Sequence, residues 1–147
     1  MGGVGMRWLG VALATGLAAC ADKSVVDTNA VVQSTIAGAY GLTSINGRPL
    51  PQNLGRDGLG AVDVLAGSIQ LNPDATYQDV LVVRRRGAHG VEIFTDTIRG
   101  GFIHVERSIM MTPKDGGDPA FFDFQDDGSL SNELPGFWLV YRRDAVR

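Results

Sequence analysis

Cysteine is almost absent from this sequence of 147 residues, since Cys20 is the only one. No intramolecular disulfide can form, and a single thiol cannot build a Cys-x-x-Cys metal or redox motif. Histidine is scarce as well. His89 and His104 are the only two, and they do not stand at the spacing of a His-x-x-x-His metal site. Metal and thiol chemistry therefore have few residues to draw on.

The sequence also lacks the usual signatures of an enzyme. It has no Gly-x-Ser-x-Gly elbow that would present a serine nucleophile. The acidic residues of the C-terminal half gather among glycine and proline, where aspartate commonly forms turns, and they do not follow the spacing of a calcium-binding loop. We expect His89 in a turn and His104 on the outer face of a strand. The sequence therefore predicts a protein that is not an enzyme, with no catalytic residue, no metal site and no cofactor.

Long hydrophobic runs are missing too. The longest lies near the N-terminus at residues 8–17 and follows Arg7. It has about 10 residues, half of what a membrane-spanning helix needs. A charged start, a short apolar core and small residues at its end are typical of a secretory signal. A start at Met6 would give an equally good signal, so the sequence leaves the true start open between Met1 and Met6.

The apolar run ends in Leu17-Ala18-Ala19-Cys20, which resembles the lipobox of bacterial lipoproteins. The resemblance implies that residues 1–19 are a cleaved signal peptide and that Cys20 carries a covalent diacylglycerol and an N-acyl chain. Two or more chains anchor a protein firmly, whereas one alone does not. Because Ala21 rather than aspartate follows the cysteine, the resemblance favours the periplasmic face of the outer membrane over the inner membrane. The alternative is an ordinary cleaved signal in which Cys20 stands by chance.

Neither sign of charge dominates: 13 Lys and Arg stand against 16 Asp and Glu, giving a net charge of −3. A mildly acidic domain gains little from the phosphates of nucleic acid, so we expect no nucleic-acid partner. Arg84-Arg85-Arg86 is the one basic cluster. We interpret it as strand-end arginines that solvate a turn, with Arg85 on the face opposite to its neighbours. Contact with anionic headgroups, lipopolysaccharide phosphates or an acidic protein is the alternative.

Glycine is plentiful, at 20 residues, while long helical patterns are missing. We expect a flexible tether over residues 20–34 and one all-β domain over residues 35–147. Turn signals such as Asn46-Gly47 separate short runs with partial alternation. Residues 55–60 are expected to form a loop. The pattern predicts an antiparallel up-and-down barrel of about eight strands at 38–45, 61–71, 77–85, 91–98, 102–112, 120–125, 129–133 and 137–143.

Several of these segments resemble small bacterial lipocalin-like lipoproteins, a calycin-type family of β-barrels that is mostly uncharacterised. Residues 36–42 leading into 45–51 are similar to the family's first strand and turn, and residues 71–77 to its second hairpin. Residues 137–143, Phe-Trp-Leu-Val-Tyr-Arg-Arg, are similar to its aromatic and basic closing strand. Gly38 and Tyr40 parallel the Gly-x-Trp signature of lipocalins, with tyrosine in place of tryptophan.

An eight-stranded barrel is just wide enough to fill with side chains or to hold one small ligand. We expect a packed barrel with a structural or protein-interaction role in the cell envelope; the alternative is binding of a small apolar ligand inside it. Arg107 is out of place on its apolar face, and it either lies at the barrel rim or pairs inside with Asp79 or Asp96. The residues expected to form the core, or to line a ligand, are Tyr40, Leu42, Ile69, Leu71, Ile103, Val105, Ile109, Phe122, Phe124 and Tyr141.

Overall fold

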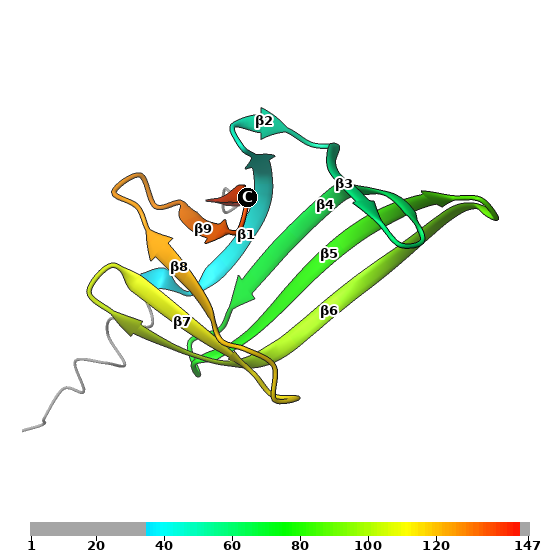
Figure 1. The fold of residues 1–147 in the computed structure, drawn as a ribbon. Helices are drawn as coiled ribbons and strands as arrows, with labels where there is room; N and C mark the ends of the chain where they lie inside the picture. The colour runs from blue at the N-terminus through cyan, green and yellow to red at the C-terminus, as the bar shows by residue number, and fades with distance from the viewer. Residues whose placement is uncertain (1–34, 145–147) are drawn as a thin grey trace, which may run out of the picture.

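The computed structural model describes residues 35–144, and the predicted signal peptide, Cys20 and the predicted tether lie outside them. Apart from Thr35 and Ile36, which have helical conformation, the described chain is an antiparallel meander of strands (Figure 1). No helix that could span a membrane occurs among residues 35–144. The strands are β1 (Gly38–Ile45), β2 (Arg48–Pro49), β3 (Gln52–Asp57), β4 (Gly60–Leu71), β5 (Thr76–Gly87), β6 (Gly90–Val105), β7 (Ser108–Pro113), β8 (Ala120–Phe124), β9 (Leu130–Leu134) and β10 (Phe137–Arg143).

The first strand closes the sheet on itself. β1 pairs with β10 along one edge and with the end of β4 along the other, where Gly38 lies opposite Leu71. Strands β1 and β4 to β10 thereby form a closed barrel of eight strands, and β2 and β3 are added outside the closure. The predicted eight-stranded antiparallel barrel is confirmed, and its architecture is compatible with a lipocalin-like fold.

The loop expected at residues 55–60 is largely replaced by strand. Residues 52–57 form β3, which pairs with the start of β4 from Gln52 opposite Val64 to Asp57 opposite Gly60. The glycines permit this pairing instead of breaking it. Gly55 and Gly60 both have positive φ, and a side chain on Gly60 would lie 2.4 Å from the carbonyl oxygen of Arg86. The glycine-rich composition here reflects close backbone approach inside a sheet.

The strand break expected at Gly100-Gly101 is also wrong. β6 runs through both glycines, and the turn lies at Glu106-Arg107. A side chain on Gly100 would lie 2.0 Å from the carbonyl oxygen of Thr112 and 2.9 Å from the ring of Tyr77. Glycine is therefore required where β6 passes close to its neighbours, and Figure 1 shows β6 curving through the sheet as one strand.

Because the turn lies at Glu106-Arg107, residues 102–105 occupy the faces opposite to those expected. Phe102 lies opposite Met111 and His104 opposite Ile109, so these four side chains share the inner face. Ile103 and Val105, expected inside, point outward and are 50% and 61% exposed. The expectation of an outer His104 is wrong for the same reason: its ring is half-buried, 6.2 Å from that of Phe124. A two-residue turn inverts the alternation that one unbroken strand would have kept.

Arg107 lies in this turn, so it is at the rim and not inside the barrel. Its guanidinium pairs with the exposed carboxylate of Asp126, in the turn that joins β8 and β9. The alternative of an internal pair with Asp79 or Asp96 does not occur. Asp127 in the same turn accepts hydrogen bonds from the backbone N–H and the hydroxyl of Ser129 at 3.0 and 2.6 Å.

Bulky side chains fill the barrel. Phe122 and Tyr141 meet edge to face, with ring centroids 5.9 Å apart. The chain enters the barrel at Ile36, whose carbonyl accepts a 2.6 Å hydrogen bond from the Tyr40 hydroxyl. Phe124 is half-buried against this cluster. The other residues expected in the core, apart from Ile103 and Val105, are buried: Tyr40, Leu42, Ile69, Leu71, Ile109, Phe122 and Tyr141.

The two adjacent phenylalanines of β8 test this assignment of faces. Phe122 is 4% exposed, whereas Phe121 is 60% exposed. Phe122→Ala should lower the free energy of unfolding by about 3–5 kcal/mol, because it leaves a cavity against Tyr141. Phe121→Ala is the matched control and should change it by less than about 1 kcal/mol. Denaturant titration would measure both, and equal losses would show that the faces are misassigned.

A ribbon that projects from the barrel as candidate interaction surface

Three strands are longer than the barrel that they help to close. β1 pairs with β4 only over residues 68–71, and β7 pairs with β6 only over residues 100–105. The remaining part of β4, β5 and β6, together with β3, projects beyond the closure as a twisted sheet, here called the ribbon (residues 52–67 and 80–99). Figure 1 shows the ribbon extending to one side of the barrel. At about 3.3 Å per residue, the projecting part of β6 is roughly 30 Å long.

The ribbon and the chain entry lie at opposite ends of the barrel. In an antiparallel meander alternate turns share an end, and Gly38 at the start of β1 lies opposite Leu71 at the end of β4. The turns at residues 72–75, 106–107 and 125–129 therefore lie at the entry end. The ribbon tip, with Leu59 and the turn at 88–89, lies at the other end.

A buried carboxylate organises the outer face of the ribbon. Asp63 is only 3% exposed and accepts hydrogen bonds from Asn53 at 2.8 Å, Arg84 at 2.9 Å and Arg86 at 2.9 Å. The register produces this cluster, because Asn53, Asp63 and Arg84 lie opposite one another on adjacent strands. The Asn53 amide and then the two guanidinium groups hold the pKa of Asp63 below its usual range.

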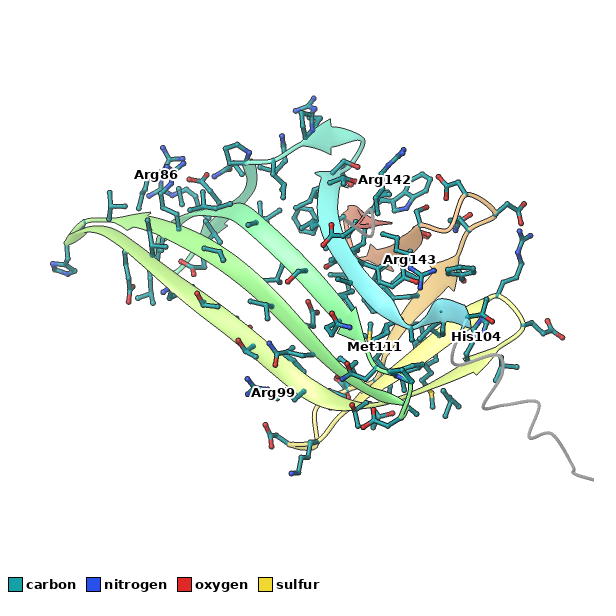
Figure 2. The ribbon with its side chains drawn as sticks, turned by 180° about the vertical axis from the view of Figure 1, so that it is seen from behind. Arg86, Arg99, His104, Met111, Arg142 and Arg143 are labelled. Carbon is teal, nitrogen blue, oxygen red and sulfur yellow. The ribbon has the colours of Figure 1, made fainter. Side chains whose placement is uncertain are left out.

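Arg85 lies on the other face, as predicted. Its guanidinium contacts Asp57 at 3.0 Å and Glu92 at 3.7 Å, and it lies 4.9 Å from the centre of the Phe94 ring. Each arginine of the triplet thus has at least one acidic partner within the ribbon. Figure 2 shows Arg86 near the ribbon tip, far from the labelled residues of the barrel. The three arginines hold the ribbon strands together, and this favours the structural interpretation over direct contact with headgroups.

Two aspartates face the inner side of the sheet without a cation beside them. Asp79 lies opposite Ile98, and Asp96 lies on the next rung opposite Leu81. Asp79 is largely buried, and its Oδ1 has no hydrogen-bond partner. Burial, reinforced by the charge of Asp96, raises the pKa of Asp79 to about 6. No ion pair to either carboxylate occurs among residues 35–144.

The raised pKa of Asp79 predicts how the stability of the fold changes with pH. Because the fold favours the protonated carboxyl, ionising Asp79 costs stability, and the cost appears as the pH rises from about 4 to above 6. Asp79→Asn should raise the free energy of unfolding at pH 8 by about 2–3 kcal/mol and leave it nearly unchanged at pH 4. Denaturant titrations from pH 4 to 8 would measure the difference from wild type, with Asp118→Asn in an exposed loop as control. A difference that does not vary with pH would contradict the assignment.

Two open hollows lie at the surface of the described chain. One of about 290 Å³ lies at the ribbon tip between Leu59, Arg85 and His89. Another of about 610 Å³ is lined by Gln78, Arg99, Thr112 and neighbouring residues of β5 to β7. His89 lies in the turn between β5 and β6, as expected. No group of three His, Cys, Asp or Glu side chains arranged for a metal ion occurs in the described part of the chain.

Sequence reasoning found the arginine triplet but missed the ribbon. The available signal was length, since the valine- and threonine-rich run from 76 to 99 is longer than a small barrel needs.

Comparison with known proteins adds no assignment: no family model, no curated protein and no solved structure matches this chain.

Proposed function

We propose that this chain is a lipoprotein of the bacterial cell envelope whose packed, lipocalin-like barrel is a non-enzymatic platform for protein interaction. The lipobox residues ending at Cys20 support a covalent lipid anchor, with the periplasmic face of the outer membrane favoured. The membrane would then be contacted through the anchor, and nucleic acid would not be a partner. The observation that carries the proposal is the ribbon, which leaves the barrel at the end opposite to the chain entry.

The filled interior supports a surface role over an internal ligand. Tyr40, Ile69, Leu71, Ile109 and Leu130 are each 0% exposed and belong to one continuous core. A pocket that binds a small molecule typically has a volume of about 300–1,000 Å³. Binding of a small apolar molecule inside the barrel is therefore the second candidate. Native mass spectrometry of the purified chain would reveal such a molecule as a discrete added mass.

Replacing the anchor residue tests the membrane part of the proposal. Cys20→Ala removes the only thiol that can receive diacylglycerol. The variant should lose incorporation of a radiolabelled fatty acid and should leave the membrane fraction or accumulate unprocessed. Its matched control is Ala19→Gly, which keeps a small residue before the cysteine and should be labelled like wild type. A Cys20→Ala chain that is still labelled and cut at the same place would contradict a lipid anchor.

A further inference from the structure

The ribbon ends in a long strand edge that no described strand covers. β6 runs from Gly90 to Val105, but its pairing with β7 begins only at Gly100 opposite Pro113. Residues 90–99 therefore pair with β5 on one side and with no strand among residues 35–144 on the other. Natural proteins protect such edges with proline, charged side chains (lysine above all), bulges or covering loops. This stretch of β6 contains no proline, no lysine and no irregularity of register, and its charged residues are Glu92, Asp96 and Arg99.

The backbone groups that point to the open side can be identified. The carbonyl of Arg99 accepts a 2.8 Å hydrogen bond from the backbone N–H of Lys114, which follows β7, whereas the N–H of Phe102 is directed to Ala75 at the start of β5. Odd-numbered residues of β6 thus direct N–H and C=O away from β5, and even-numbered residues direct them toward it. At residues 91, 93, 95 and 97 four donors and four acceptors face the open edge.

The side chains along this edge divide into two kinds. Val91 and Ile93 on the outer face are 66% and 62% exposed. Glu92 and Asp96 alternate with Phe94 and Ile98 on the inner face. Glu92 has Arg85 as a partner, whereas Asp96 has no ion pair among the described residues, and neither has the buried Asp79 beside it. One face of the edge therefore carries the β-branched residues Val91, Ile93, Thr95 and Thr97, and the other combines apolar side chains with the carboxylates of Glu92 and Asp96.

Charge argues against a second copy of this chain as the occupant. In a symmetric antiparallel pair of β6 edges centred on Phe94, Asp96 would lie opposite Glu92 of the other copy, and in a pair centred on Asp96 the two Asp96 side chains would lie opposite each other. Like charges in neighbouring cross-strand positions destabilise a sheet, whereas opposite charges stabilise it. The carboxylates thus oppose self-association and favour a strand with basic side chains on that face.

We propose that the open edge of β6 binds an extended segment of another protein by strand addition, with Lys or Arg opposite Asp96 and apolar or β-branched residues opposite Val91 and Ile93. Backbone hydrogen bonds at residues 91–97 would supply affinity, and the alternating faces would supply specificity, as in other cases of strand addition. This inference rests on the proposed interaction role and names the class of partner.

Two synthetic peptides test the proposal. The first is a nine-residue peptide that alternates lysine with threonine or valine, and the second carries glutamate in place of every lysine. The full-length chain in mild detergent should bind the lysine peptide, measured by fluorescence anisotropy, at least tenfold more tightly than the glutamate peptide. Methylation of the peptide nitrogens that face β6 should abolish binding without changing the protein. Equal binding of the lysine and glutamate peptides, or of the methylated and unmethylated ones, would overturn the proposal.

Variants of Thr95 locate the binding edge. Thr95→Pro removes one N–H that faces the open side and should weaken lysine-peptide binding at least tenfold, while Thr95→Val keeps that N–H and should bind like wild type. Asp96→Asn should weaken binding about threefold to fivefold. If Thr95→Pro fails to fold, the methylated peptide decides the matter alone. Unchanged binding by folded Thr95→Pro, or a wild-type edge already occupied by a second copy or by the chain's own N-terminal segment, would overturn the inference.

These outcomes are independent of the anchor. The peptides can fail while Cys20 is still acylated, which would leave the envelope lipoprotein intact and remove only this partner. Conversely, loss of acylation would leave peptide binding by the full-length chain unaffected.

Discussion

The length mismatch between neighbouring strands is the constraint on which the rest of the structure depends. β1 offers only four residues to β4, and β7 only six to β6, whereas β4, β5 and β6 are 12, 12 and 16 residues long. A barrel closes only where every strand has two neighbours. The long strands therefore extend beyond the closed region. Their projecting part carries the arginine cluster, the acidic inner face and the open edge.

Glycine residues and ion pairs stabilise the projecting ribbon. Gly60, Gly87 and Gly100 each lie where a Cβ atom would approach a backbone oxygen to 2.4 Å or less. Asp63 gathers Asn53, Arg84 and Arg86 on the outer face, while Arg85 links β3, β5 and β6 on the other. These side-chain pairs across strands stabilise the ribbon together with Val64, which belongs to the apolar core, and with Leu54 and Leu81, which pack against it. The barrel by contrast depends on a single apolar core that includes Tyr40, Phe122 and Tyr141.

Sequence reasoning succeeded where local chemistry decides and failed where tertiary contacts do. The turn at Asn46-Gly47, with φ of 52° and 73°, and the eight-strand meander follow from local patterns. Gly100-Gly101 reads as a turn in the sequence, because the clash that requires glycine comes from Thr112, which is distant in the chain. Because the turn was predicted at Gly100-Gly101, Ile103 and Val105 were assigned to the inner face, although they lie on the outer one. The ribbon was missed, since alternation gives the faces of a strand but not where its neighbours stop, and only the length of the run from 76 to 99 pointed to it.

Hydrogen exchange of the unbound protein tests the open edge most directly. Amides of residues 91, 93, 95 and 97 should exchange rapidly, because they face no strand, while the amides of residues 92, 94, 96 and 98 directed to β5 should be protected. Beyond the start of β7, the amides of Ile103 and Val105 should be slow as well. Strong protection at all four odd positions between 91 and 97 in a dilute monomer would show that the edge is covered, and would contradict this account of the ribbon.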